Sequence, residues 1–373
     1  MTKLILLTKK GKSQEVRYTG RSKCCRICLL LAPLVLCGFV IFYYISTVLC
    51  QRSNLKTFHP MPQSWQNRTK QEPAGQKAPL TESPPINPPV AKTPGPYEII
   101  YPHKYQIILN EPEKCKGQDP FVVLMVPVRP EDQEARDIIR RTWGSESTVP
   151  GVVIRTLFLL GVTNSQETLQ QKLIVEGQEH HDLLQFDFHD SYRNLTIKTM
   201  LMMEWLNTYC HNAPYAAKVD TDMFLNVDLL VNKLLNPQSA QAKRDYITGA
   251  VVRGGIARRD HDSKWYMPEE VFSKDTYPCY VSGNAYVFSM DLPEKILRAS
   301  NHVKPVHLED VYLGMCLESL GISPKDPPSP GMFQMWYRSY DRCLFSGFIS
   351  VTGIQLKDLE RNWANFRQPG SYC

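Results

Sequence analysis

Tyr215-Ala-Ala-Lys-Val-Asp-Thr-Asp222 is the stretch that constrains the fold most, because a short apolar run ends there in two acids. Tyr215–Val219 suits a buried strand, and the apolar pattern resumes at Met223. Burying two carboxylates one residue apart costs free energy unless a cation or a hydrogen-bond donor compensates them. An isolated Asp-x-Asp triplet is usually only a solvated turn or a helix cap, so its context has to decide its meaning.

The segments on either side supply that context, because strand and helix patterns alternate along the chain. Strands are predicted at Phe121–Val126, Val152–Leu160 and Leu183–Phe188, and helices at Glu131–Trp143, Ser165–His180 and Arg193–Tyr209. Such alternation predicts an α/β domain with a mostly parallel central sheet flanked by helices. Ligands of these sheets bind beyond the carboxyl ends of the strands. The two acids lie at that edge.

Two acidic sites carry the predicted chemistry. Asp220 and Asp222 offer the hard oxygen ligands that suit a magnesium- or manganese-like ion bridging to a diphosphate, whose departure the ion would assist. Glu309 and Asp310 open a second apolar helical pattern, where acids can simply stabilise the first turn. The functional alternative makes Asp310 a general base that takes a proton from an attacking hydroxyl.

The N-terminal part predicts a membrane anchor. Residues 27–49 form a run of 23 without a charged side chain, which is long enough to span a bilayer. Eight basic residues and one acid precede it, so the preceding flank is expected in the cytosol. A cleaved signal peptide would have a shorter apolar region and a small-residue cleavage site. Because this tail carries the basic excess of the whole chain, the net charge of +6 gives no reason to expect nucleic acid as a partner.

Composition then divides the chain into four parts. Ten prolines between Pro60 and Pro96 predict an extended, disordered stem. The predicted parts are a cytosolic tail (1–26), a transmembrane signal anchor (27–49), a Pro-rich luminal stem (50–97) and a luminal catalytic domain (98–373). Sequons at Asn67 and Asn194 are candidate glycosylation sites in that topology.

The cysteines and tryptophans of the predicted luminal part indicate disulfides and core positions but do not identify a function. Six cysteines follow the stem, and in an oxidising compartment they allow up to three disulfides whose pairing the sequence leaves open. Trp143, Trp205 and Trp363 lie in apolar patterns and are expected in the core. Trp265 and Tyr266 lie in a loop and are the better candidates for a ligand platform.

Six segments together resemble the β1,3-glycosyltransferase family, which contains β1,3-galactosyltransferases and β1,3-N-acetylglucosaminyltransferases. They occur in a consistent order over about residues 118–320 and are Glu134–Gly144, Arg155–Gly161, Asp187–Thr199, Lys218–Asp222, Tyr280–Gly283 and Glu309–Gly314. The resemblance implies a GT-A-like fold, a UDP-sugar donor, a glycoprotein or glycolipid acceptor, Mn²⁺, inversion at the transferred sugar and a Golgi membrane location. Homo-oligomerisation stays open.

The resemblance also assigns roles to residues. Asp220 and Asp222 would hold the metal and the diphosphate, and Asp310 would be the base. Lys218, Arg140 and Arg141 fall in stretches that border the donor site in this family, although both arginines also fit a purely structural role. Trp265, Tyr266, Gly283 and Glu309 would line the acceptor cleft.

The expected donor is UDP-galactose and the expected acceptor group is the 3-hydroxyl of a terminal N-acetylhexosamine. Lys264–Pro268 and Tyr286–Ser289 are more similar to the galactosyltransferase branch than to the N-acetylglucosaminyl branch. The alternative donor is UDP-N-acetylglucosamine.

One departure from the family pattern favours a third alternative. The family typically has a metal-binding His about eleven residues before a Trp near the C terminus. Here Thr352 or Gly353 falls at that place, before Trp363. A hydroxyl is a poorer ligand than imidazole for such an ion. A weakly active or non-catalytic luminal binding protein is therefore the third hypothesis.

Overall fold

The computed structural model describes residue 95 and residues 97–163, 167–239 and 241–373. The predicted tail and anchor, nearly all of the stem and the sequon at Asn67 lie outside these residues. Within the described residues, no helix has both the length and the apolar character needed to cross a membrane.

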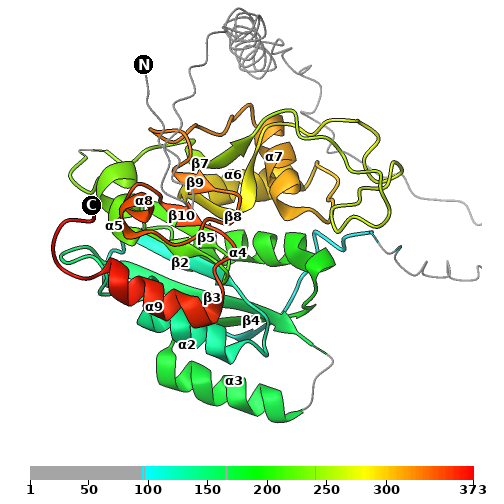
Figure 1. The fold of residues 1–373 in the computed structure, drawn as a ribbon. Helices are drawn as coiled ribbons and strands as arrows, with labels where there is room; N and C mark the ends of the chain where they lie inside the picture. The colour runs from blue at the N-terminus through cyan, green and yellow to red at the C-terminus, as the bar shows by residue number, and fades with distance from the viewer. Residues whose placement is uncertain (1–94, 96, 164–166, 240) are drawn as a thin grey trace, which may run out of the picture. The chain divides into compact units, whose positions relative to one another are not determined.

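A seven-stranded sheet forms the centre of the described chain, in the order β1-β4-β3-β2-β5-β8-β7 (Figure 1). The strands are β1 (Ile107–Leu109), β2 (Val122–Pro127), β3 (Ile154–Val162), β4 (Leu183–His189), β5 (Tyr215–Val219), β7 (Ile247–Val252) and β8 (Tyr280–Ser289). The strands predicted from the sequence are thus confirmed, with shifted ends. Strands β4, β3, β2 and β5 are mutually parallel.

The edges of the sheet differ from the expectation of a mostly parallel sheet. Strand β1 is antiparallel to β4, and β8 is antiparallel to both β5 and β7. Between β7 and β8 the chain runs through a long loop instead of a crossover helix, and an antiparallel pair needs no crossover. The sheet is therefore mixed, with a parallel centre.

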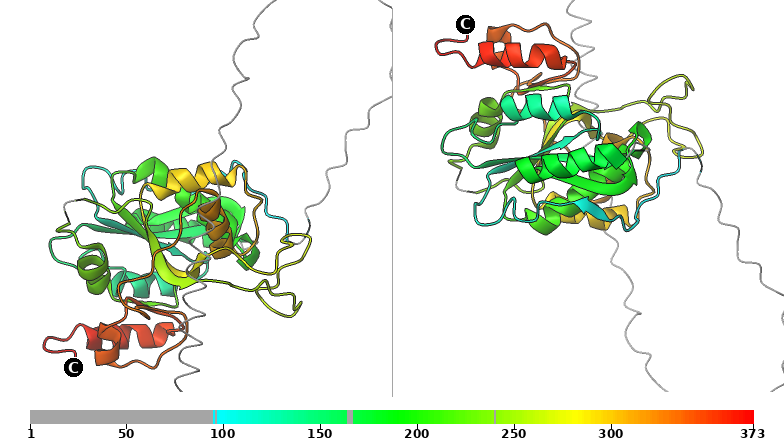
Figure 2. Two further views of the ribbon diagram at one scale, coloured as in Figure 1. Left: turned by 90° about the horizontal axis from the view of Figure 1, so that it is seen from above. Right: turned by 90° about the horizontal axis from the view of Figure 1, so that it is seen from below.

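Helices cover both faces of the sheet (Figures 1 and 2). The longer helices are α2 (Gln133–Arg141), α3 (Glu167–His180), α4 (Leu195–Tyr209), α6 (Leu292–Ser300), α7 (Glu309–Ser319) and α9 (Leu356–Phe366). The short ones are η2 (Tyr192–Asn194), α5 (Val227–Leu229), the π-helical η3 (Leu230–Leu235) and α8 (Arg342–Ser346). A small second sheet has the order β6-β10-β9, from Phe224–Leu225, Ser350–Val351 and Phe333–Gln334.

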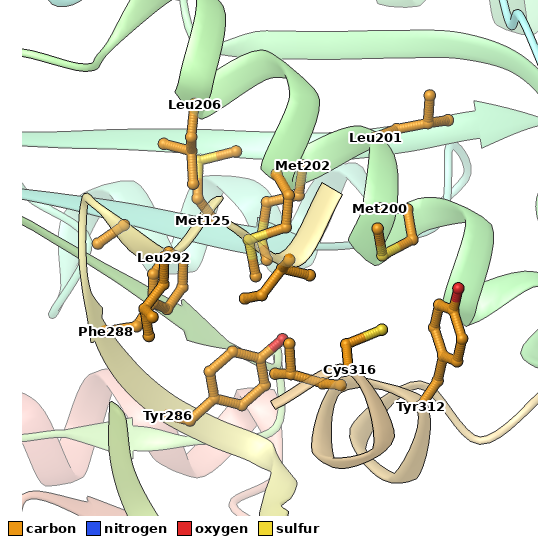
Figure 3. Packing of buried hydrophobic residues seen from close by; sticks show 14 of the residues in the cluster. Met125, Met200, Leu201, Met202, Leu206, Tyr286, Phe288, Leu292, Tyr312 and Cys316 are labelled. Carbon is orange, nitrogen blue, oxygen red and sulfur yellow. The ribbon is translucent and has the colours of Figure 1, made fainter. Parts of the chain in front are cut away.

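The side chains of β2 alternate between two hydrophobic cores. Val123 and Met125 belong to the core that includes residues of α4, α6 and α7, which Figure 3 shows from close by. Val122 and Leu124 belong to the core that includes residues of α2 and α9. A strand that is buried on both faces has a continuous run of apolar residues, and this run allowed β2 to be predicted from the sequence.

Cysteines and tryptophans outside the sheet complete the packing. Cys115 pairs with Cys210 and Cys343 with Cys373, whereas Cys316 is a free, buried thiol. The first disulfide joins the segment before β2 to the end of α4, and the second joins α8 to the C-terminal residue. The three tryptophans expected in the core are buried there, as predicted.

Candidate active site

Strand β5 delivers the acidic pair to the carboxyl edge of the sheet, as predicted. The strand is buried along its whole length and is paired on both sides, with β2 and with β8. The pairing continues one residue further, because the Asp220 N–H donates to the carbonyl oxygen of Asn284 at 2.9 Å. The first acid is therefore fixed by backbone hydrogen bonds at the point where the strand ends.

A buried lysine connects this acid to the start of α7. Lys218 Nζ lies 2.7 Å from Asp220 Oδ1 and 3.3 Å from Glu309 Oε1. It also donates to the carbonyl oxygen of Gly283 on β8. Burial alone would lower the pKa of Lys218, but the two carboxylates raise it above the usual value. The lysine is thus a fixed positive charge between β5, β8 and α7.

Glu309 is the most deeply buried acid of the group, with 6% of its surface exposed. Its Oε2 lies 3.3 Å from Thr199 Oγ1 and 3.4 Å from Tyr286 OH, and both hydroxyls can donate to it. Burial raises the pKa of Glu309 to about 7, while Lys218 acts in the opposite direction. Glu309 is therefore an ion-pair partner of Lys218, and its carboxylate does not face solvent.

Asp310 is held by two backbone N–H groups. Its Oδ2 accepts from Gly283 N at 3.0 Å, and its Oδ1 accepts from Val311 N at 2.8 Å. Burial raises the pKa of this carboxyl, and the two N–H groups oppose that rise. A Cβ on residue 283 would lie 2.6 Å from Glu309 Oε1 and 3.3 Å from Asp310 Oδ2, so only glycine allows β8 to approach both acids. Asp310 is partly exposed, in contrast to Glu309.

Asp222 meets the C-terminal segment in which the sequence lacks a histidine. The N–H of Ile354 donates to the carbonyl oxygen of Asp222 at 2.8 Å, and a backbone hydrogen bond from Gly353 reaches the carboxylate. Burial and the charge of Asp220 raise the pKa of Asp222. Residue 353 therefore lies directly beside the second acid, but it offers a backbone N–H where a side chain could have offered a ligand.

The donor set suits a hard divalent ion that shares its coordination with a substrate. Among the described residues, no group of three or more His, Cys, Asp or Glu side chains is placed to hold a metal. Magnesium-like ions are commonly held by one or two carboxylates, with substrate phosphates and water completing the shell. Asp222 is exposed at this edge, and a cation bound there would oppose both the desolvation and the charge of Asp220 that raise its pKa.

A second buried ion pair at the same edge was not predicted. Lys198 Nζ on α4 lies 2.7 Å from Asp190 Oδ2 and donates to the carbonyl oxygen of Val128 at 2.9 Å. Burial lowers the pKa of Lys198, and Asp190 opposes this change. The available signal was a lysine inside an otherwise apolar helical face, Leu195 to Met203.

Two exposed aromatic side chains lie near the acids at the start of α7. Tyr192 and Trp265 are each 46% exposed, and a side-chain hydrogen bond joins them. Burial of the hydroxyl and the charges of Asp310, Glu309 and Asp220 raise the pKa of Tyr192 to about 12. Trp265 was predicted at the cleft from its loop position, whereas Tyr192 was missed because nothing in its local pattern singles it out.

The ring of Tyr266 ties the Trp265 loop to the start of α7. It contacts the ring of Tyr97 edge-on at 5.5 Å between centroids, and Tyr97 contacts His307 at 5.2 Å. His307 lies two residues before Glu309. Tyr266 therefore supports the loop, and Trp265 is the more exposed of the two predicted platform residues.

A family model described as Galactosyltransferase matches residues 134–328, which is more than half of the chain. The chain belongs to the galactosyltransferase family. The matched region contains both acidic pairs and Lys218, whereas Gly353 lies beyond it.

Individual relatives agree with this family. Beta-1,3-galactosyltransferase 2 of Pongo abelii is 43% identical over 271 residues, covering 72% of this chain and 64% of that protein. The Homo sapiens protein of the same name is 42% identical over 267 residues, covering 71% and 63%. Beta-1,3-galactosyltransferase 1 of Mus musculus is 42% identical over 264 residues, covering 71% and 79%. The chain thus spans slightly less than two thirds of the first two relatives.

A solved structure gives a weaker likeness. A glycosyltransferase involved in the glycosylation of the major capsid of PBCV-1 matches 66% of this chain and 100% of its own. The sequence identity is 7% and the TM-score is 0.35, which is too low to support an argument.

In this galactosyltransferase-family chain, the two arginines predicted near the donor site lie apart from the acids. Arg140 binds both oxygens of Asp182 at 2.8 Å and one oxygen of Glu176 at 2.8 Å. Asp182 immediately precedes β4, so this cluster lies at the amino edge of the sheet. Arg141 pairs with Glu360 on α9, where both side chains are exposed. These contacts support the structural alternative for both residues.

The sequon at Asn194 is firmly packed in the structure. Asn194 Nδ2 donates to the carbonyl oxygen of His189 at 2.8 Å. Thr196 is fully buried, and its Oγ1 donates to the carbonyl oxygen of Val306 at 2.6 Å. Glycosylation at Asn194 stays a prediction, and it would have to precede this packing.

The raised pKa of Glu309 predicts a pH dependence of stability. Since the folded-state pKa of about 7 exceeds the usual value of 4.5, the stabilisation is complete below pH 4.5 and is lost as the pH rises through 7. Between pH 5 and 8, the free energy of unfolding should fall by about 2–3 kcal/mol less in Glu309→Gln than in the wild type. Urea unfolding of the purified full chain at both pH values measures this difference. Equal pH dependence in variant and wild type would contradict it.

Proposed function

We propose that the chain transfers galactose from UDP-galactose to the 3-hydroxyl of an acceptor glycan, with inversion at the transferred carbon. The expected acceptor unit is a terminal N-acetylhexosamine. The observation that carries the proposal is the partly exposed Asp310 carboxylate beside the charged group of Lys218, Asp220 and Glu309. A base next to a fixed site for a charged leaving group is what a single displacement needs.

Each residue then has a role in the proposed reaction. Asp310 takes the proton of the acceptor hydroxyl as that oxygen forms a bond to the anomeric carbon, and the bond from that carbon to the diphosphate oxygen breaks. Lys218 and Glu309 hold the edge of β8 and the start of α7 in register, so the base keeps its place. Asp220 and Asp222 would hold Mn²⁺, which when bound supplies positive charge for the leaving diphosphate.

The location that we propose is the Golgi membrane, with a GT-A-like catalytic domain in the lumen. The sequence pattern of residues 1–97 supports a type II anchor and stem, and two disulfides in the described part are consistent with an oxidising compartment. The relatives named above are β1,3-galactosyltransferases, which supports galactose as the donor sugar.

A donor-by-acceptor screen of the purified full chain, with and without Mn²⁺, tests the proposal. We expect transfer from UDP-galactose to a β-linked N-acetylglucosaminide, and dependence on Mn²⁺. Preference for UDP-N-acetylglucosamine would select the alternative donor. No transfer from any UDP-sugar would overturn the enzymatic function, and Asp222→Ala with unchanged metal dependence would overturn the metal assignment.

A silent binding protein is the second candidate because Thr352 or Gly353 falls where the family pattern has a metal-binding His. Gly353 contributes a backbone hydrogen bond to Asp222. A thermal-shift assay with UDP and Mn²⁺ tests whether the nucleotide site is present, because a chain that has lost the site should show no shift. Both the active enzyme and the silent binding protein should show one. A shift without turnover favours the binding protein, whereas a shift with turnover favours the enzyme.

The exposed Trp265 gives a prediction about the acceptor. Trp265→Ala should raise the KM for the acceptor about tenfold while changing kcat and the KM for UDP-galactose less than about twofold, because a lost stacking surface weakens only one substrate. Steady-state kinetics with each substrate varied in turn measures this. Trp336→Ala is the matched control, since Trp336 is a more exposed tryptophan in another segment. With a short acceptor it should leave both KM values unchanged, and equal effects of the two substitutions would contradict the assignment.

A further inference from the structure

A cavity adjoins the acidic edge but is not lined by Asp220, Asp222 or Asp310. Its volume is about 700 Å³. Its lining comes from the segment before α8, the turn between β10 and α9, and α9 itself, and it includes Tyr337, Tyr340, Ile354, Lys357, Arg361 and Asn362. All of them follow the region that the family model matches. The cavity is therefore a feature of the C-terminal part of the chain.

A buried amide of this lining has no partner of its own. Asn362 is 6% exposed, and across the described part of the chain its side chain makes no hydrogen bond. An amide offers two donor hydrogens and an acceptor oxygen. The Asn362 amide is not among the fully buried, unpartnered polar atoms of the described residues, so it is accessible from the cavity that it lines. Asn362 can therefore pair with a ligand in the cavity.

Two tyrosines, Tyr337 and Tyr340, form the aromatic wall of the cavity. Tyr337 is 62% exposed. Gly353 packs against Tyr337, and its φ of +77° is a conformation that favours glycine at this turn. Tyr340 is fixed by its hydroxyl, which donates to Asn365 Oδ1 at 2.8 Å. The wall thus presents exposed ring faces from an anchored segment.

The charges of the cavity do not favour a nucleotide diphosphate. Arg361 is already paired with Asp358, with 2.7 Å between Nη2 and Oδ1. Lys357 is the only other cation of the lining, and the metal-binding candidates Asp220 and Asp222 are absent from it. Ring faces, an amide and a paired carboxylate and guanidinium instead suit the apolar faces and hydroxyl groups of a carbohydrate.

The cavity adjoins the candidate active site through the backbone. Ile354 lines the cavity and donates its N–H to the carbonyl oxygen of Asp222 at 2.8 Å. We propose that this cavity is a carbohydrate subsite that binds sugar units of the acceptor glycan remote from the unit that is glycosylated. The substrate class rests on the proposed transfer to a glycan. An enzyme with this subsite would prefer acceptor glycans of several sugar units to a single sugar.

Direct binding tests the subsite without requiring turnover. The probe is a tetrasaccharide of alternating galactose and N-acetylglucosamine, added to the purified full chain and followed by saturation-transfer NMR and isothermal titration. Tyr337→Ala and Asn362→Ala should each weaken its binding about tenfold, the effect of one lost ring or hydrogen-bond contact. Tyr337 is exposed, so its substitution leaves the fold intact even if that of Asn362 does not. Asp310→Asn should leave most of the affinity for the tetrasaccharide while slowing transfer about 10²–10⁴-fold.

Kinetics provides the second arm. In an active enzyme, Tyr337→Ala should raise the KM for the tetrasaccharide acceptor about tenfold and leave the KM for a monosaccharide glycoside unchanged. Unchanged tetrasaccharide binding in Tyr337→Ala would overturn the subsite. A weaker Kd for UDP together with unchanged glycan binding would also overturn it and would identify a nucleotide pocket. A chain that binds the tetrasaccharide but transfers nothing would retain the subsite and lose only the proposed function.

Discussion

Asp310→Asn is expected to lower kcat by about 10²–10⁴-fold, because a general base contributes that much to a proton transfer. The substitution keeps the size of the side chain but removes its ability to accept a proton at neutral pH. An Asn side chain can still accept one of the two hydrogen bonds that Gly283 and Val311 donate to Asp310. The Kd for UDP in the presence of Mn²⁺ should therefore change less than about threefold. Initial rates and titration calorimetry measure the two quantities.

A matched control distinguishes catalysis from loss of structure. Asp341 also carries a carboxylate bound to a helix, since its Oδ1 accepts from Leu344 N at 2.7 Å at the start of α8. Asp341→Asn removes the same charge away from the acidic edge and should leave kcat within about twofold of wild type. If Asp310→Asn loses activity only in proportion to folded protein, or retains full turnover, Asp310 is not the base.

Glu176→Gln is expected to lower the free energy of unfolding by about 3–5 kcal/mol, the cost of leaving a buried charge uncompensated. Both oxygens of Glu176 bind Arg136 at 2.7 Å, and fewer than 5% of either residue is exposed. The other N–H groups of Arg136 are satisfied by the carbonyl oxygens of Arg129 and Pro130. The guanidinium therefore cannot reach water when its counter-charge is removed. Urea unfolding of the full chain measures the loss.

An exposed pair with the same chemistry provides the control. Asp132 binds Arg129 through two hydrogen bonds of 3.0 Å, but 70% of the Arg129 side chain is exposed. Asp132→Asn should cost less than about 1 kcal/mol, since water solvates an exposed arginine that has lost its partner. Similar losses in both variants would show that burial is not what makes the Glu176 pair important.

The parts of the fold that the sequence predicted are those with strong local patterns. Strand β2 is apolar at every buried position because both of its faces are covered, and β5 ends where its apolar run meets Asp220. The antiparallel edges were missed because strand direction depends on the path of a long loop, which has no local signature. The sheet centre was therefore predictable, but its edges were not.

The same limit applies to the candidate site. Asp220, Asp222 and Asp310 could be selected from their positions at the ends of apolar runs. The contact of Lys218 with Glu309 joins residues 91 positions apart, and that of Lys198 with Asp190 depends on which face of α4 is buried. Pairings of this kind follow from tertiary packing. The structural role of Arg140 was one of two alternatives until its contacts with Glu176 on α3 and with Asp182 before β4 were known.

The stereochemistry of the product tests the central claim most directly. A single displacement assisted by Asp310 should convert the α-linked galactose of UDP-galactose into a β-linked, 3-substituted product. Proton NMR of the purified product gives the anomeric coupling, and a proton–carbon correlation spectrum gives the shift of the substituted acceptor carbon. We expect a large axial–axial coupling and substitution at position 3. An α-linked product would contradict the single displacement, and release of free galactose alone would contradict transfer to an acceptor.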